Sequence, residues 1–277
     1  MRKLHILTLT WNGLDKLQKL RPGLLQNIEK ETKGKRPTLS DAVWYIRDNG
    51  SKDGTVEEVS KWPEVKVFDI GHNRDSFSKG VNYLFEQANP DDNDLVMLLN
   101  NDITFPFDEA LREMIYLQKE TKAEVIGCLL MYPGSNKIQH AGVIFSEKYG
   151  RMPWHYRAGE EWDGNASDSR YFQAVTGACC LVSAKAFREV QGMNERLLWS
   201  FDDIDLCLRI GQRKPNNIAM CGCAVVHHEE SASLKKNPVN KIFMKQNVEY
   251  FRSQWTGKYD IDHDRYLRDE KYRRINI

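Results

Sequence analysis

The chain has 277 residues, of which 41% are hydrophobic and 29% charged, and its net charge is +1. This length allows one large domain or two small ones with a sizeable core. A net charge so near zero excludes a strong overall field toward nucleic acid or anionic membrane. The charge is uneven, because residues 231–277 carry a net +5 and the first 230 residues a net −4. The basic end is either a solvated face or a contact for an anionic partner.

The lack of recognisable targeting signals and the cysteine pattern both favour a location inside the cell. No apolar run approaches the ~20 residues of a membrane span, and the start MRKLHILTLTWNG lacks a small-residue cleavage site. The six cysteines lack zinc-ribbon spacing, and Cys179-Cys180 and Cys221-x-Cys223 lie in strand-like apolar runs. We therefore expect a cytoplasmic protein with reduced cysteines buried in its core.

Apolar, β-rich runs alternate with helical patterns along the first 132 residues. Strands are expected at 4–11, 42–48, 65–70, 94–100 and 124–132, and helices at about 14–30, 53–62, 76–88 and 107–120, with Asp53 as an N-cap. Near-continuous apolar strands that alternate with helices predict an α/β fold with a mostly parallel central sheet, covered by helices on both faces.

The remainder of the chain changes character twice. Residues 133–172 are rich in Gly, aromatic and polar residues, which predicts loops and short antiparallel pieces. The apolar pattern returns from residue 173, and residues 238–255 predict a closing amphipathic helix. We expect one compact α/β domain with a C-terminal helical extension.

Polar groups follow several of the predicted strands, where open parallel sheets bind their ligands. Thr10 and Asn12 end the first strand, Asp48 ends the second, and Asn101 and Asp102 follow the fourth. The first strand is followed by WNGLDKL, which excludes the G-x-G-x-x-G dinucleotide loop, and no Walker A motif is present. The stretch DNGSKDG at 48–54 fails the register of a calcium loop, because Gly50 and Lys52 fall at ligand positions.

Two of these strand ends could hold a metal. Asp102 is either the ligand of a divalent cation that also touches phosphate, or an N-cap for the helix near Phe107. His227-His228 ends the strand CAVVHH, and these histidines are either structural or contacts for metal or phosphate.

Three carboxylates crowd the stretch WSFDDIDLCLR at 199–209. If a helix begins near Phe201, Asp202, Asp205 and Arg209 share one face and form a polar edge that pairs locally. Asp203 points about 100° away, toward an apolar face. A carboxylate at a helix N-terminus against an apolar wall stays ionised and can still take a proton.

Eight motifs in order now resemble those of the family 2 glycosyltransferases with the GT-A fold, particularly rhamnosyltransferase-like, O-antigen-type members. The resemblance covers about residues 4–256. Its carriers are TLTWN, RDNGSKDGT, HNRDSFSKGVN, LLNND, YPGSNKIQHAGV, VTGACCLVSAKAFREVQGMNE, FDDIDLCLR and VVHHEESAS. Two departures stand out: Asn100 where the metal motif has a first carboxylate, and an additional glutamate after the paired histidines.

The resemblance implies a GT-A domain over 1–230 and a basic helical extension over 231–277. Within the domain, 1–105 would bind the nucleotide-sugar and 106–230 the acceptor. Asp203 would be the catalytic base, and Asp102 with His227 would bind Mg²⁺ or Mn²⁺. The nucleotide-sugar would contact Thr10, Asn12, Asp48, Asn73, Asn101, Gly177 and Trp199, and the acceptor would lie near His140, His155 and Asp202.

The implied reaction is an inverting glycosyl transfer, in which Asp203 deprotonates an acceptor hydroxyl that attacks the anomeric carbon. The donor would be UDP- or dTDP-linked, and the acceptor a saccharide or glycolipid of polysaccharide assembly. The basic C-terminal tail leaves open a polyanionic acceptor or peripheral attachment at the inner membrane face, and the oligomeric state is open. The alternatives are a sugar-nucleotidyltransferase and a non-catalytic module that binds sugar-nucleotides or glycans.

Overall fold

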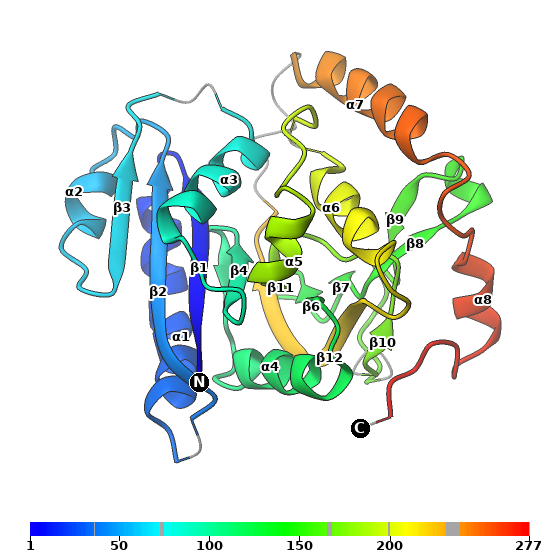
Figure 1. The fold of residues 1–277 in the computed structure, drawn as a ribbon, viewed down its shortest axis with the longest axis horizontal. Helices are drawn as coiled ribbons and strands as arrows, with labels where there is room; N and C mark the ends of the chain where they lie inside the picture. Colours follow the sequence, from blue (N-terminus) through cyan, green and yellow to red (C-terminus); the bar gives the residue numbers. More distant parts are fainter. Residues whose placement is uncertain (36, 73–74, 165–167, 199, 231–238, 277) are drawn as a thin grey trace.

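The chain is described as a computed structural model (Figure 1), which covers residues 1–35, 37–72, 75–164, 168–198, 200–230 and 239–276, with side chains from 244 onward in the last range. Its centre is a large sheet in which β10, β12, β6, β11, β4, β1, β2 and β3 are neighbours in that order, while β5 pairs with β12 and β7 with β6. A separate two-stranded sheet joins β8 to β9.

The first half of the sheet is parallel, as its apolar runs predict. Its strands are β1 (Arg2–Thr10), β2 (Leu39–Asp48), β3 (Val65–Asp69) and β4 (Leu95–Leu99). The register sets Thr10 beside Asp48 on β1 and β2, and Leu7 beside Leu98 on β1 and β4. The polar residues that follow these strands therefore meet at one edge of the sheet.

The second half is mixed. Its members are β5 (Ile103–Thr104), β6 (Val125–Met131), β7 (Ile138–His140), β10 (Arg170–Tyr171), β11 (Cys179–Ser183) and β12 (Ile218–His228). Strand β11 runs antiparallel to β4 and β6, between which it lies, and β12 runs parallel to β6. The two-stranded sheet consists of β8 (Val143–Phe145) and β9 (Pro153–His155), which agrees with the short antiparallel pieces predicted over 133–172.

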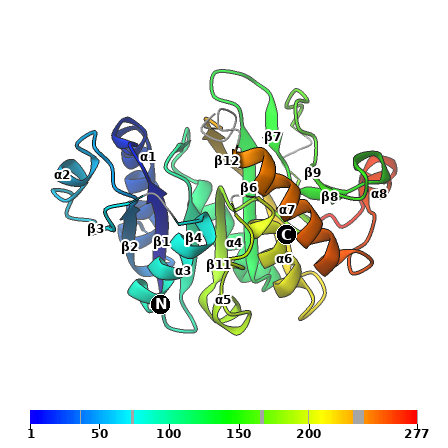
Figure 2. The same ribbon diagram turned by 90° about the horizontal axis from the view of Figure 1, so that it is seen from above.

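Helices cover both faces of the sheet (Figures 1 and 2). One core lies between the sheet and the helices α1 (Leu14–Lys33) and α4 (Ala110–Thr121), where Leu17, Leu20 and Met114 are fully buried. The other lies under α3 (Phe77–Ala88), α5 (Ala184–Glu189), α6 (Asp202–Gly211) and α7 (Val239–Trp255). The short helices are α2 (Thr55–Val59), η1 (Glu147–Tyr149) and α8 (His263–Arg268).

The C-terminal part packs against the rest of the chain. Helix α7 lies over α6, and the indole of Trp255 donates to Asp205 Oδ1 at 2.9 Å. Beyond α8, the backbone pairs with the edge strand β10, where Tyr171 N donates to Arg273 O at 3.0 Å. These contacts cover the outer edge of the large sheet, which would otherwise present unpaired backbone groups.

The cysteine prediction is correct at five positions and wrong at one. All six thiols are free, but Cys223 is exposed while the other five cysteines are buried. The reason is a register shift in β12 between Cys221 and Val225, which turns Cys223 away from the core. Among the described residues, no helix is both long and apolar enough to cross a membrane.

Candidate active site

Four predicted nucleotide-side residues meet at the carboxyl ends of β1, β2 and β4. Asn101 Nδ2 donates to Thr10 Oγ1 at 3.0 Å, which joins the end of β4 to that of β1. Asn12 has a left-handed φ of 47°, and its backbone N–H donates to Ser51 Oγ at 2.7 Å. Ser51 in turn donates to the fully buried carboxylate of Asp48 through its N–H at 2.7 Å and its hydroxyl at 2.6 Å.

The side chains at this edge of the sheet are closely packed and hydrogen-bonded to one another and to the backbone. A Cβ at Gly13 would lie 2.5 Å from Thr10 Oγ1 and 2.6 Å from Asn101 Nδ2, so no larger residue fits there without movement. Asp53 accepts from the N–H groups of Leu14 and Thr55, both at 3.2 Å. It thus joins the starts of α1 and α2, although Gly54 holds the N-cap position predicted for Asp53.

Asp102 lies against a histidine at the next point along the edge. Asp102 Oδ1 is 3.2 Å from His228 Nε2, and both side chains are nearly buried. His228 Nδ1 is 2.7 Å from Gln139 Oε1, while Gln139 Nε2 donates to the His228 carbonyl at 3.3 Å. Because Gln139 Oε1 can only accept, Nδ1 of His228 carries a proton, and a neutral ring turns its Nε2 lone pair toward the carboxylate.

The structure therefore brings His228 to Asp102, whereas the sequence analysis selected His227. Strand β12 continues through both histidines, with His227 opposite Thr104 and His228 opposite Ile103 on β5. Side chains alternate along a strand, so only one of the two can face Asp102. The choice depends on the pairing with β5, which the motif CAVVHH does not reveal.

Asp203 stands at the start of α6, as predicted. The helix is preceded by Phe201 in a left-handed conformation, with φ 63°. Asp203 is half-buried, and its Oδ2 accepts the N–H of Gly177 at 2.8 Å. A Cβ at Gly177 would lie 3.1 Å from Asp203 Cβ, so a glycine permits this close approach.

The two other carboxylates of this helix behave differently from each other. Asp205 Oδ2 is 2.7 Å from Arg209 Nε, which confirms a local pair. Asp202 does not share this pair, because it turns toward α3 and its Oδ2 accepts from Ser78 Oγ at 3.3 Å. Burial, and then the charge of Asp203, raise the pKa of Asp202 to about 7. The predicted polar edge therefore contains Asp205 and Arg209 but not Asp202.

The two histidines of the predicted acceptor region are in contact. His140 is fully buried on β7, His155 is exposed on β9, and their Nδ1 atoms are 2.8 Å apart. His140 Nε2 accepts the N–H of Thr176 at 3.3 Å. The next residue, Gly177, binds Asp203 through its own N–H, so two consecutive residues connect the histidine pair to Asp203.

The register of β11 connects the two sides of the site. Asn100 N donates to Ala178 O at 2.8 Å, and Cys179 pairs with Leu99 on β4. Gly177 binds Asp203, and its neighbour Ala178 is bonded to Asn100, two residues before Asp102. A contact chain also runs from Asp102 through His228 to Gln139, the residue before His140.

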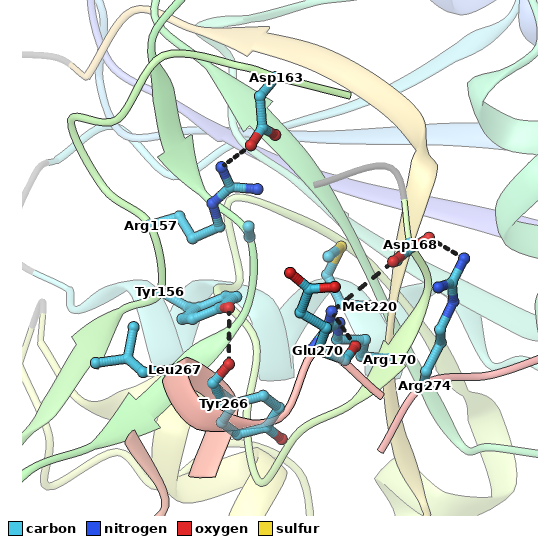
Figure 3. A pocket seen from close by; sticks show the side chains of 11 residues that line it. Tyr156, Arg157, Asp163, Asp168, Arg170, Met220, Tyr266, Leu267, Glu270 and Arg274 are labelled. Carbon is cyan, nitrogen blue, oxygen red and sulfur yellow. Dashed lines mark hydrogen bonds and ion pairs between the residues drawn. The ribbon is translucent and has the colours of Figure 1, made fainter. Parts of the chain in front are cut away.

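Two predicted residues, Asn73 and Trp199, lie outside the described residues. A pocket of about 270 Å³ is lined by none of the predicted ones (Figure 3). It lies between the Tyr156–Arg157 segment and the C-terminal chain. Its arginines face carboxylates of the same pocket, as in Arg157 with Asp163 at 3.0 Å and Arg274 with Asp168 at 2.7 Å. The second of these ion pairs fastens the C-terminal chain to the segment before β10.

The chain is similar in sequence to a protein family and to several relatives. A model described as glycosyl transferase family 2 matches residues 28–190. The chain is 29% identical over 167 residues to the protein y4gI of Sinorhizobium fredii and 22% identical over 217 residues to the O-antigen biosynthesis protein RfbC of Myxococcus xanthus. These matches cover 58% and 76% of this chain but only 18% and 17% of the relatives.

A third relative is closer in length. It is the N-acetylglucosaminyl-diphospho-decaprenol L-rhamnosyltransferase of Mycobacterium tuberculosis, 26% identical over 217 residues that cover 71% of this chain and 69% of the relative. Among solved structures, the mannosyltransferase PcManGT of Pyrobaculum calidifontis, in complex with GDP-Man and Mn²⁺, superposes with a TM-score of 0.59. The match has 11% identity and covers 94% of this chain and 66% of that one.

A second solved structure, GalNAc-T7 with UDP, GalNAc and Mn²⁺, gives a TM-score of 0.62 at 13% identity. That match covers 96% of this chain and 54% of that one. At such low identity these likenesses concern the fold alone, which is the GT-A fold that the motifs predict.

Proposed function

Since the chain belongs to glycosyl transferase family 2 and has the GT-A fold, we propose that it transfers a sugar, with inversion, from a nucleotide-diphospho-sugar to a saccharide hydroxyl. Asp203 is the base that takes the proton of this hydroxyl. The observation that carries the proposal is the pairing of β4 with β11. Through this pairing Gly177, which binds Asp203, lies close to the end of β4 that is followed by Asp102. A base and a leaving-group site must be close for a single displacement.

A divalent cation fits between Asp102 and His228. Octahedral ligands at right angles and 2.0–2.1 Å from Mg²⁺ are about 2.9 Å apart, close to the 3.2 Å between Asp102 Oδ1 and His228 Nε2. The Nε2 lone pair and the carboxylate face each other, an arrangement that a proton or a cation between them would stabilise, and Asn100 Nδ2 also lies 3.5 Å from Nε2. Bound there, Mg²⁺ or Mn²⁺ would neutralise charge on the leaving diphosphate.

The donor's own oxygens would complete the cation's coordination. In the part of the chain that the structure describes, no group of three or more His, Cys, Asp or Glu side chains could hold a metal. A two-residue site therefore favours a cation that arrives with the diphosphate. Thr10, Asn12, Asp48 and Asn101, which meet at one edge of the sheet, are proposed to bind the nucleotide, which we expect to be UDP or dTDP. We accordingly propose that residues 1–105 bind the donor and residues 106–230 the acceptor, and that residues 231–277 form a C-terminal extension.

The acceptor is proposed to be a saccharide or glycolipid of polysaccharide assembly. The relatives named for O-antigen biosynthesis and for rhamnosyl transfer to a diphospho-decaprenol sugar support this class. The net positive charge of 231–277 would also suit a polyanionic acceptor or an anionic membrane surface.

The test is the variant Asp203→Asn. If Asp203 is the base, the rate of transfer falls by about 10²–10⁴, while binding of the nucleotide, measured by titration calorimetry with UDP, dTDP and GDP, is unchanged. Release of nucleoside diphosphate from a panel of UDP-, dTDP- and GDP-sugars reports the rate. Near-full turnover in this variant would remove Asp203 from the role, and a wild-type protein that turns over no donor in the panel would contradict the function.

A further inference from the structure

The contact between His140 and His155 requires one shared proton. Their Nδ1 atoms are 2.8 Å apart, and the rings meet edge to face at 85°. Two nitrogens at this distance form a hydrogen bond only if one of them carries the proton and the other accepts it. Two neutral rings satisfy this condition, whereas a doubly protonated pair would set two N–H groups against each other.

The direction of this bond follows from the backbone. His140 Nε2 accepts the N–H of Thr176 at 3.3 Å, so Nε2 carries no proton. Burial in the first place, and then the charges of His155 and His228, hold the pKa of His140 well below its usual value, so the ring is neutral. Its proton is therefore on Nδ1 and is donated to His155. Because His155 Nδ1 accepts, a neutral His155 carries its own proton on Nε2.

The Nε2–H of His155 lies on the side of the ring away from His140, because Nδ1 is the atom that contacts His140. His155 is exposed on β9, so a hydroxyl group of a ligand can reach its ring. Thr176 and Gly177 are consecutive, and their N–H groups hold His140 and Asp203 respectively. One turn of backbone thus fixes both the base and the histidine pair.

We propose that His155 Nε2–H is a fixed hydrogen-bond donor to a second hydroxyl of the acceptor, next to the hydroxyl that Asp203 deprotonates. The acceptor is accordingly a sugar with neighbouring hydroxyls and not an isolated alcohol. His155 contacts this acceptor and determines specificity, and His140 is a positioning residue that acts through His155. This inference rests on the proposed function, in which Asp203 is the base.

The first test is spectroscopic and needs no substrate. Two-bond ¹⁵N–¹H correlations of the ¹⁵N-histidine-labelled full chain report which ring nitrogen carries the proton. We expect His155 as a single Nε2–H tautomer whose Nδ1 accepts a hydrogen bond. His140→Gln can keep the bond from Thr176 but frees His155 Nδ1, so His155 should sample both tautomers and take up a proton at higher pH. His140→Asn can still donate to His155 and should keep the wild-type pattern.

The second test measures specificity. Wild-type protein is given methyl pyranosides, which carry neighbouring hydroxyls, or cyclohexanol, which carries one, and release of nucleoside diphosphate is followed. His155→Phe should raise the KM for the pyranosides and reduce the preference for them over cyclohexanol by roughly tenfold, the value of one hydrogen bond. His155→Gln, whose amide N–H has similar reach, should retain most of the preference. His263→Gln, outside the pair, is the matched control and should match wild type.

The outcomes separate the two proposals. The inference is overturned if His155→Phe keeps the full preference for pyranosides, or if wild-type His155 carries its proton on Nδ1. If the wild-type protein still turns over a donor in these cases, the proposed function stands. A wild-type protein that turns over no donor overturns the proposed function and, with it, the acceptor role of His155. The tautomer measurement on wild type and the two His140 variants then still decides whether the pair is fixed as described.

Discussion

The buried carboxyl of Asp202 should make the stability of the folded chain depend on pH in a defined direction. Asp202 is 6% exposed, and burial and the neighbouring Asp203 raise its pKa from 3.8 to about 7. Between these two values the folded chain holds a proton that the unfolded chain has lost. The free energy of unfolding therefore falls as pH rises through this window, and the penalty is complete above about pH 7.

The magnitude follows from the width of the window. Each pH unit between the two pKa values is worth about 1.4 kcal/mol, which bounds the effect at roughly 4 kcal/mol. Because the raised pKa of Asp202 reflects the repulsion from Asp203 as well as burial, we expect on the order of 2 kcal/mol from Asp202 itself. Asp202→Asn has nearly the same shape and no charge, so it should become more stable relative to wild type as pH rises.

The assay is urea unfolding of both proteins at several values from about pH 4 to about pH 8. The control is Asp15→Asn on the exposed face of α1, whose difference from wild type should change little over the same range. A constant difference between Asp202→Asn and wild type would show that Asp202 is ionised throughout, and the reasoning from burial would then be refuted.

Two further predictions concern the metal and the base. His228→Ala should weaken Mn²⁺-dependent binding of UDP, dTDP or GDP in calorimetry by at least about tenfold, whereas His227→Ala should not; equal losses would contradict the assignment. Gly177→Ala places a Cβ 3.1 Å from Asp203 Cβ, so we expect transfer to slow by about tenfold or more while nucleotide affinity is kept, and an unchanged rate would show that the backbone yields.

The grouping of Thr10, Asp48 and Asn101 at one edge of the sheet could be predicted because it follows from local sequence and one rule. Apolar runs fixed the positions of β1, β2 and β4, and parallel strands of one sheet end at the same edge. Thr10, Asp48 and Asn101 therefore had to lie together, and the structure shows their bonds. The position of each of these residues depends on a strand with a strong apolar pattern and on strands that are its neighbours in the sheet.

Features that depend on distant partners were not predictable in this way. Asp202 turns from Arg209 to Ser78, a residue 124 positions earlier, and no periodicity within α6 reveals a hydroxyl that α3 supplies. The selection of His228 over His227 rests on the pairing of β12 with β5, a strand of two residues. The bond between His140 and His155 depends on the short sheet of β8 and β9, in a region that reads only as loops and antiparallel pieces.

The antiparallel direction of β11 explains why the strand pattern did not predict the contact of Gly177 with Asp203, although the family resemblance had selected Gly177 as a nucleotide-sugar contact. Polar groups were sought after strands, because ligands bind beyond the carboxyl ends of a parallel sheet. Thr176 and Gly177 precede a strand, and in a parallel β11 they would lie at the opposite edge. Since β11 runs against β4, its entry is at the ligand edge, where Ala178 O accepts from Asn100 N at 2.8 Å. A register slip of one residue would move this entry relative to Asp102, so the pairing that stabilises the sheet also sets the spacing between Asp102 and Gly177, which binds Asp203.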